Sequence, residues 1–356
     1  MTIYIADIIP LIIILQSILF ALVLLTDKGS KRISNGYLAS FLIMLALQFT
    51  VLLNETYGAP NAFLSATLCV YGFAYGPLLY LYSRSLMYRK FRFSLLQLAH
   101  FLPFVILLLL AALGYSFCGR FGFLLYVSLL TYSTLAILKV ITYRKIVKET
   151  QSSLSRTDLV WLQWTIIIFC IALLLDMVDQ LFWSTDLKAG ISSIHVMILL
   201  LINWMFYKGL KQPQIFLGVT PLDEAVFMEK SKTPSKTTPD TFEKQDLEHI
   251  QTFMRESNPY TDPDLSLKQL SERLQIPPRR LSYLINAFLG QNFMGFINNH
   301  RIEKAKSRLQ YPKDKGETIL EVMYEVGFNS KSSFNTLFKR KTGLTPSEYR
   351  KKYHSS

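Results

Sequence analysis

The sequence predicts an all-α protein in which a seven-span transmembrane helical bundle precedes a soluble helical domain with two helix-turn-helix units. The first observation is compositional, because 51% of the 356 residues are hydrophobic and only 18% are charged, whereas soluble domains carry about 25%. The second is that the net charge of +13 is unevenly spread. Residues 1–212 hold 16 Lys/Arg, 8 Asp/Glu and nearly all long apolar runs, while residues 213–356 hold 22 and 17. The chain therefore divides into a membrane half and a water-soluble half.

The membrane half contains seven apolar stretches near the roughly 20 residues that a helix needs to cross the hydrocarbon core. They are residues 3–25, 36–53, 62–82, 95–114, 121–141, 159–181 and 191–207. Of the 16 Lys/Arg in this half, 14 lie in alternate connections (26–35, 83–94, 139–158) or just after residue 207. Since cations near span ends stay on the cytoplasmic side, we expect a multi-pass protein of the inner, cytoplasmic membrane. Its N-terminus would lie outside and its C-terminal domain in the cytoplasm.

Three ionisable side chains in this half are candidates for sensing a signal. Asp176 and Asp179 share one face of the sixth expected span, and His195 lies near the outer end of the seventh. Ionisable groups in a membrane are costly and often functional, so one hypothesis is a pocket for an extracytoplasmic small molecule, a cation or a proton. The alternative, which the sequence favours, is that these groups are hydrated at the headgroups or pair inside the bundle.

The three cysteines, Cys69, Cys118 and Cys170, are odd in number and widely separated. This pattern predicts neither a disulfide framework nor a zinc site. We therefore expect no metal and no cofactor.

A tether separates the two halves. Residues 213–241 contain four prolines and a Lys/Ser/Thr/Pro-rich tract, which cannot bury a core. As a flexible coil this linker would span roughly 30 Å. The expected division is thus 1–212 for the membrane domain, 213–241 for the linker and 242–356 for the soluble domain.

The soluble half contains two similar units of short helix, turn and second helix. In the first, Ser266 and Gln269 form a capping box, and Pro278 begins a second helix that Gly290 ends. In the second, Thr318 and Glu321 form another capping box, Gly327 allows the turn, and Ser330 caps a helix through Lys341. A helix over residues 293–310 joins the units; its 18 residues span about 27 Å. In helix-turn-helix proteins the second helix of each unit enters the major groove of DNA.

The charge of this region agrees with a polyanionic partner. Residues 265–356 carry 17 Lys/Arg against 7 Asp/Glu, which is enough to displace counterions from several phosphates.

Residues 265–352 resemble the DNA-binding domain of the AraC/XylS family of bacterial transcription regulators. The motifs that carry the resemblance are Leu281–Asn286, Gly290–Phe293, Phe296–Asn298, Arg301 with Ala305 and Leu309, Val326–Phe334, Phe338–Lys339 and Gly343–Arg350. Each motif alone is weak, but their order and spacing are specific. The resemblance covers about a quarter of the chain. The Pro277–Pro278 pair departs from the polar cap that the family often has.

The resemblance implies which side chains face DNA. In the first recognition helix these are Arg279, Ser282 and Tyr283, with Arg280 nearer a phosphate. In the second they are Lys331, Ser332, Asn335 and Thr336, while Lys339 is expected at a phosphate. Arg279 and Asn335 are the best candidates for base readers, because Arg pairs bidentately with guanine and Asn with adenine. Arg301 is expected in a structural ion pair.

The sequence thus predicts a membrane-anchored regulator of transcription, not an enzyme, with double-stranded DNA and the lipid bilayer as partners. An unidentified small-molecule or ionic signal would act through the membrane half. Pairing of two chains is compatible with this function, since a homodimer would read two copies of a short site. The alternative is a transporter or membrane enzyme with an appended regulatory domain, although the sequence contains no phosphate loop, GxGxxG or HExxH motif.

Overall fold

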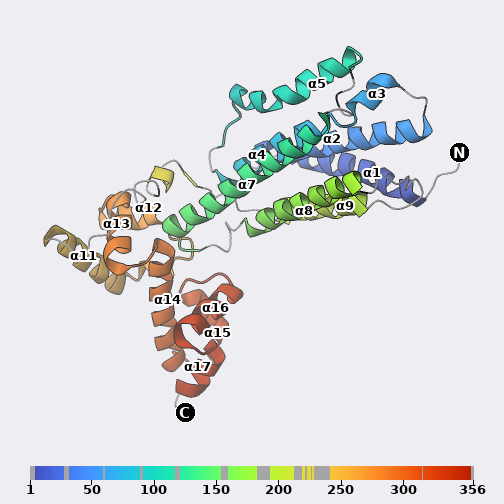
Figure 1. Ribbon diagram of the computed structural model, residues 1–356. Helices are drawn as coiled ribbons and strands as arrows, with labels where there is room; N and C mark the ends of the chain where they lie inside the picture. The colour runs from blue at the N-terminus through green and yellow to red at the C-terminus, as the bar shows by residue number, and fades with distance from the viewer. Residues whose placement is uncertain are drawn as a thin grey trace. The chain divides into compact units, whose positions relative to one another are not determined.

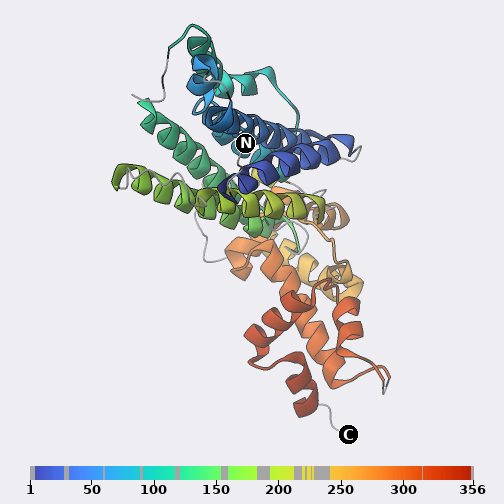
Figure 2. The ribbon, with the colours of Figure 1, turned by 90° about the vertical axis from the view of Figure 1, so that its right-hand side faces the viewer.

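The computed structural model describes residues 5–27, 32–58, 61–88, 91–115, 117, 121–153, 159–182, 193–211, 219–220, 223–225, 227, 241–314 and 316–353. It divides into two compact units (Figures 1 and 2). The first comprises residues 1–142 and 159–218, and the second comprises residues 143–158 and 219–356. The described elements are helical, which agrees with the all-α prediction.

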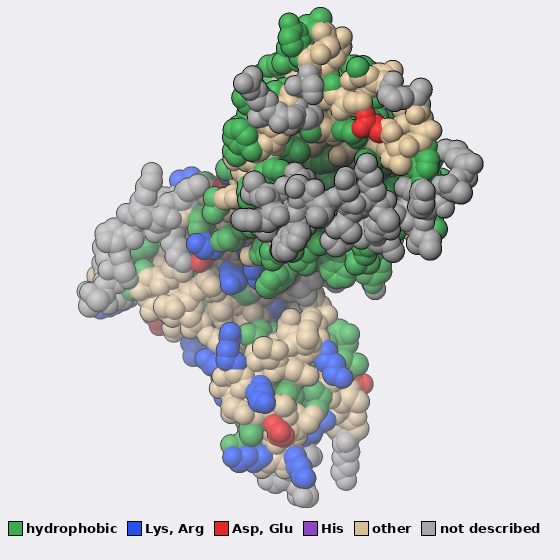
Figure 3. Space-filling model, turned by 45° about the vertical axis from the view of Figure 1, so that its right-hand side comes forward, with side chains coloured by type: hydrophobic (Ala, Val, Ile, Leu, Met, Phe, Trp, Pro, Cys, Tyr) green, Lys and Arg blue, Asp and Glu red, His purple; other side chains and the backbone are tan. Residues whose placement is uncertain are grey.

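The first unit is a bundle of mostly apolar helices. Its elements are α1 (Ile5–Thr26), α2 (Arg32–Tyr57), α3 (Ala62–Thr67), α4 (Gly72–Met87), the 3₁₀ helix η1 (Leu95–Phe101), α5 (Leu102–Ala112), most of α7 (Phe123–Thr150), α8 (Val160–Phe182) and α9 (Ser193–Lys211). Helix α1 packs along α2 and α9, α2 packs on α4, and α8 and α9 lie side by side (Figures 1 and 2). Hydrophobic side chains dominate the surface of this unit in the space-filling view (Figure 3).

The prediction of seven spans is wrong by the measure of helix length and composition. Within the described residues, four helices are long and apolar enough to cross a membrane: Ile8–Thr26, Arg32–Tyr57, Leu95–Ala112 and Phe123–Thr150. The apolar stretches Val160–Leu175 and His195–Gly209 are shorter.

The third expected span illustrates why the count differs. The stretch 62–82 is divided, because α3 ends at Thr67 and α4 begins only at Gly72. The 16 residues of α4 are almost all buried. Gly72 and Gly76 allow this close packing, since an added Cβ would lie 2.5 Å from Leu125 and 2.8 Å from Tyr132 of α7. A helix enclosed by its neighbours is apolar for the same reason as a lipid-facing one, and hydropathy alone does not separate the two.

The cysteine prediction also needs correction. Cys69, in the turn between α3 and α4, is disulfide-bonded, and Cys170 in α8 is free. Cys118 lies outside the described residues.

The second unit contains two small cores that share one long helix. Its elements are the end of α7, α11 (Thr241–Ser257), the 3₁₀ helix η3 (Pro259–Thr261), α12 (Leu267–Leu274), α13 (Pro278–Leu289), α14 (Phe293–Gln310), α15 (Ile319–Glu325), α16 (Lys331–Thr342) and α17 (Pro346–Tyr353). The first half of α14 contributes Phe293, Phe296 and Ile297 to a core with α11–α13. Its second half contributes Ile302, Ala305 and Leu309 to a core with α15–α17. Figure 1 shows α14 running from one group to the other.

The predicted capping residues hold these helices as expected. The Ser266 and Gln269 side chains bond reciprocally to each other's backbone N–H groups at α12, and Thr318 and Glu321 do so at α15. Gly290, Gly327 and Gly343 adopt positive φ angles, as residues that follow a helix commonly do.

Candidate functional site

Helix α13 presents the first set of predicted contact residues. Leu281, Leu284 and Ile285 are buried in the core, so the opposite face of the helix carries Arg279 and Asn286. Tyr283 lies beside them and also packs against the core. The Arg279 side chain is exposed. The sequence predicted Arg279 and Tyr283 as contact residues, and it did not predict Asn286.

Two other predicted residues of α13 are already engaged within the second unit. Ser282 is only 4% exposed, and its carbonyl and hydroxyl oxygens lie 2.8 and 3.4 Å from the Asn286 amide nitrogen. Arg280 pairs through Nε with Asp246 Oδ2 of α11 at 2.5 Å. These two residues are thus held by the protein in this conformation.

Helix α16 presents the second set. Phe334 and Phe338 are buried, which turns Ser332, Thr336 and Lys339 toward the opposite face. Lys331, Ser332, Thr336 and Lys339 are exposed, and Asn335 is half-buried. Both predicted sets thus lie on one chain segment with a strong excess of Lys and Arg, many of which are visible on this unit in Figure 3.

Arg301 in the middle of α14 is the central polar residue of this unit. Its Nε donates to the carbonyl of Tyr260 at 2.7 Å, and Nη2 donates to the carbonyl of Asp262 at 2.7 Å. It also donates to Ser152, through Nη1 to the carbonyl oxygen at 3.4 Å and through Nη2 to Oγ at 3.2 Å. The ring of Phe328 lies 5.6 Å from the guanidinium carbon. The sequence predicted an ion pair for Arg301, and these hydrogen bonds go to neutral oxygens at the boundary of the two cores.

Burial lowers the pKa of the Arg301 guanidinium to about 10, and the carboxylates of Asp262 and Asp264 oppose that shift. The group still carries its charge at neutral pH. A buried cation bonded to several carbonyls is satisfied in place, and removing it would leave those carbonyls without their donor.

Sequence reasoning did not find the contacts of residues 149–153, which comprise the last two residues of α7 and the three that follow. Ser152 is 1% exposed, and its N–H donates to the Leu265 carbonyl at 3.1 Å. Glu149 accepts a bond from Asn286 at 3.1 Å. The sequence placed this segment in a cytoplasmic connection, and only tertiary contacts bring it to α13 and α14.

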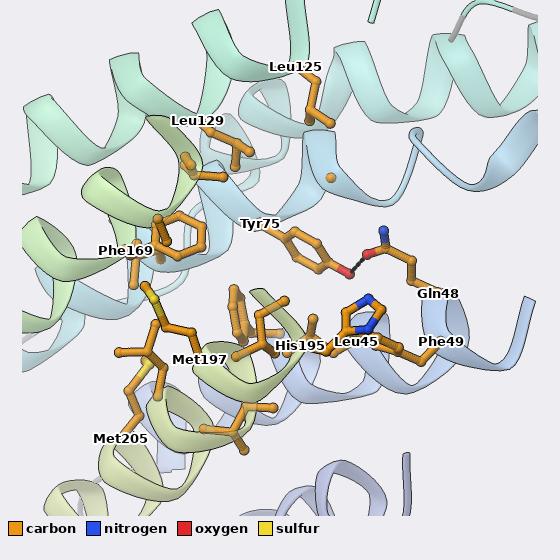
Figure 4. A pocket seen from close by; sticks show the side chains of 18 of the residues that line it. Leu45, Gln48, Phe49, Tyr75, Leu125, Leu129, Phe169, His195, Met197 and Met205 are labelled. Carbon is orange, nitrogen blue, oxygen red and sulfur yellow. Dashed lines mark hydrogen bonds between the residues drawn. The ribbon is translucent and has the colours of Figure 1, made fainter. Parts of the chain in front are cut away.

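The first unit contains a cavity of about 260 Å³ lined by side chains of α2, α4, α7, α8 and α9. Most of the lining is hydrocarbon, including Leu129, Phe169 and Met205. Polar side chains reach it as well: Tyr126 and Thr165 contribute to the lining. Tyr75 donates a hydrogen bond to Gln48 Oε1, and the His195 ring lies against Phe49 with centroids 5.1 Å apart (Figure 4). Of the three predicted sensing residues, His195 is therefore at a cavity.

The other two sensing candidates, Asp176 and Asp179, have their backbones in α8, and their side chains lie outside the described part of the structure. Among the residues described, no group of three or more His, Cys, Asp or Glu side chains could hold a metal ion.

Comparison with known proteins finds similarity in the C-terminal part of the second unit. A family model described as a helix-turn-helix domain matches residues 270–352. An HTH-type transcriptional regulator of Staphylococcus aureus is 41% identical over 87 residues, which cover 24% of this chain and 11% of that protein. The transcriptional regulatory protein YesN of Bacillus subtilis is 33% identical over 93 residues, covering 26% of this chain and 25% of its own length.

Among solved structures, the C-terminal domain of AraT, a response regulator from Geobacillus stearothermophilus, is 27% identical. It covers 33% of this chain and 89% of that chain, with a TM-score of 0.27. The family model and the transcriptional regulators named above agree with the AraC-type helix-turn-helix domain that the motifs predicted. The chain spans only a small part of the curated relatives that it matches.

Proposed function

We propose that this protein is a membrane-anchored transcription regulator that recognises double-stranded DNA through α13 and α16. The observation that carries the proposal is the AraC-type domain with two recognition helices whose outward faces present Arg279, Ser332 and Thr336. The relatives are transcriptional regulators by name. No catalytic step is required for this function.

DNA binding by the full chain tests the proposal. Duplexes enriched from a random-sequence pool by the protein in nanodiscs should share a sequence, and Arg279→Ala should weaken their binding by about tenfold, because a bidentate base contact contributes about 1–3 kcal/mol of discrimination. Arg255→Ala, an exposed arginine of α11, is the matched control and should bind as the wild type does. Equal binding to all sequences would contradict the proposal.

The membrane placement of this regulator rests on three features. Four helices of the described chain have the length and composition of membrane spans, and the Lys/Arg residues alternate between connections as the positive-inside pattern requires. Cys69 is disulfide-bonded and lies in the outer half of the third expected span, next to the connection 54–61 that the Lys/Arg pattern places outside, where disulfides form in bacteria. We propose an inner-membrane protein with its DNA-binding unit in the cytoplasm.

The signal is proposed to act at the cavity beside His195. A hydrocarbon lining with a few polar groups is typical of small-molecule sites, and it favours an apolar molecule over a bare ion, which would lose its hydration there. Such a ligand changes output only if it binds two conformations unequally.

A reporter gene under the selected operator tests the sensing function. His195→Ala should change the response of the reporter to added small amphiphiles, without altering the intrinsic sequence preference of the DNA-binding unit. Exchange of the exposed Trp204 for Phe, on the same helix but outside the lining, is the control. Asp179→Asn tests the predicted acidic partner. An unchanged response in both variants would remove these residues from the site.

A further inference from the structure

Residues 149–153, here called the α7 tail, bind within the second unit at the junction of its two cores. The backbone of Gln151 pairs with Ser266 in an isolated antiparallel bridge. The Ser152 hydroxyl lies 3.4 Å from the Pro263 carbonyl, and its N–H donates to Leu265. Tyr143, Ile146 and Val147, on the preceding turns of α7, are buried as well. The tail is therefore fixed by its main chain and by an apolar face.

Arg301 joins this tail to both cores. The same guanidinium that holds the carbonyls of Tyr260 and Asp262 donates to Ser152, and it faces Phe328 of the second core. Gly327 is also drawn into this junction, since an added Cβ would meet the Tyr260 carbonyl at 2.5 Å and Arg301 Nε at 3.0 Å. The tail thus occupies the point at which the relative position of the two helix-turn-helix modules is set.

The tail also contacts the outward face of α13 and the residues just before α16. Glu149 accepts its hydrogen bond from Asn286, which shares a face of α13 with Arg279. Ser153 Oγ donates to Asn329 Oδ1 at 3.4 Å, just before α16. Lys148, Ser152 and Ser153 line one hollow of about 530 Å³ together with Ser332, Thr336 and Arg340 of α16. A duplex seated on these faces would need the space that the tail occupies.

Electrostatic repulsion also opposes simultaneous binding of the α7 tail and DNA. The Glu149 carboxylate is held against α13, where a phosphate backbone would approach, and like charges at close range repel strongly when water is excluded. Its displacement would free Asn286, whose amide can then pair with a base.

We propose that the junction of the two modules is a docking surface for the α7 tail and that the docked tail and DNA compete for it. This inference rests on the proposed DNA-binding function. Residues 123–142 of the same helix belong to the first unit and residues 143–150 to the second, so a conformational change that draws α7 away releases the DNA-binding faces. The tail is an intramolecular competitor of DNA. Its affinity for the junction sets the fraction of chains that can bind DNA.

A reversible crosslink tests the competition directly. Bridge-paired residues have Cα atoms about 4.5–5.5 Å apart, within the range that a disulfide can span, so Gln151→Cys with Ser266→Cys should lock the tail in place. The full chain carrying both substitutions and Cys170→Ser is placed in nanodiscs with the duplex selected by the wild type. Oxidation should lower its affinity at least tenfold, and reduction should restore it. Gln151→Cys with Cys170→Ser, taken through the same cycle, controls for reduction of the Cys69 disulfide.

A variant in which the α7 tail docks more weakly should have the opposite effect on DNA affinity. Ser152→Leu does not fit the closed slot beside Arg301 and should raise affinity for the same duplex several-fold, whereas Ser307→Leu, the same exchange at an exposed position of α14, should leave it unchanged. Oxidised protein that binds as tightly as reduced protein, or more tightly, would overturn the competition while leaving DNA binding intact. If no form of the chain selects a duplex, the proposed function fails and the competition fails with it.

Discussion

At Gly327 both the backbone conformation and the packing of neighbouring atoms require a residue without a Cβ. Its φ angle is 96°, and the carbonyls of Tyr260 and Thr261 lie 2.5 and 2.9 Å from the position of an added Cβ. Gly290 also has a positive φ, of 62°, but an added Cβ there meets no atom within 4 Å. Substitutions at these two glycines therefore distinguish the cost of backbone strain alone from the cost of strain together with steric conflict.

We expect Gly327→Ala to destabilise the second unit by more than about 3 kcal/mol and Gly290→Ala by about 1 kcal/mol. Urea titrations of the full chain, followed by hydrogen exchange of α14–α16 peptides, measure both. Equal losses in the two variants would mean that the junction between the modules yields to the extra carbon.

His300 makes the stability of the second unit depend on pH. The ring stacks on Tyr260 with centroids 5.5 Å apart and meets the edge of Phe296 at 4.9 Å. Burial lowers its pKa below the ordinary value of 6.5, and the nearby Glu303 carboxylate opposes that shift. The unfolded chain therefore takes up a proton at a higher pH than the folded chain does.

Stability should consequently fall as pH drops from about 6.5 through the folded pKa of His300 and stay lower at more acidic pH. His300→Phe keeps an aromatic ring and should flatten this part of the profile of unfolding free energy. The lowered carboxyl pKa values of Glu321 and Glu348 act only below about 4.5, outside this window. A variant whose profile between pH 7 and 5.5 still matches that of the wild type would exclude His300 as the cause.

At the scale of elements, local signals determined the helices of the second unit. Ser266 Oγ accepts the N–H of Gln269 at 3.3 Å, and the Gln269 side chain accepts the N–H of Ser266 at 2.8 Å. These bonds satisfy N–H groups that a helix leaves free at its first turn. Because such bonds connect residues three apart, the start of α12 could be predicted from sequence.

Ser266→Ala should cost about 1 kcal/mol and raise the hydrogen-exchange rate of the first α12 amides several-fold. Ser307→Ala, at an exposed position within α14, removes a hydroxyl with no capping role and should leave exchange in α12 unchanged. Matching rates in the two variants would indicate that tertiary packing alone holds this helix end.

In the membrane half, local signals predicted apolar segments but not their arrangement. The 62–82 stretch has the hydropathy of a span, yet it forms two helices, and the second is enclosed against α7 through Gly72 and Gly76. Hydropathy reports that a segment avoids water and does not report whether lipid or protein surrounds it. The contacts between helices determine whether lipid or protein surrounds the segment.

At the scale of the molecule, the disulfide at Cys69 tests the orientation. If the connection before the third expected span faces the oxidising compartment, Cys69 near it should resist maleimide in denatured, unreduced protein and react after reduction, whereas Cys170 should react in both. Cys69→Ser identifies the band shift. Protein made in cells that lack periplasmic disulfide formation should have a reactive Cys69 from the start. If Cys69 is still blocked there, the assigned orientation of this connection is wrong.

The sequence by itself determined the all-helical class, the AraC-type domain and the outward residues of α16, because caps, periodicity and motif spacing act over a few residues. Arg301 was recognised in its motif, but its carbonyl partners were not predicted. The tertiary structure decided which residues far apart in the sequence come together. Ser152 contacts Arg301, Glu149 contacts Asn286, and His195 lines the same cavity as Gln48 and Tyr75. These contacts join residues separated by more than a hundred positions, and their energy depends on burial and geometry that exist only once the helices have packed.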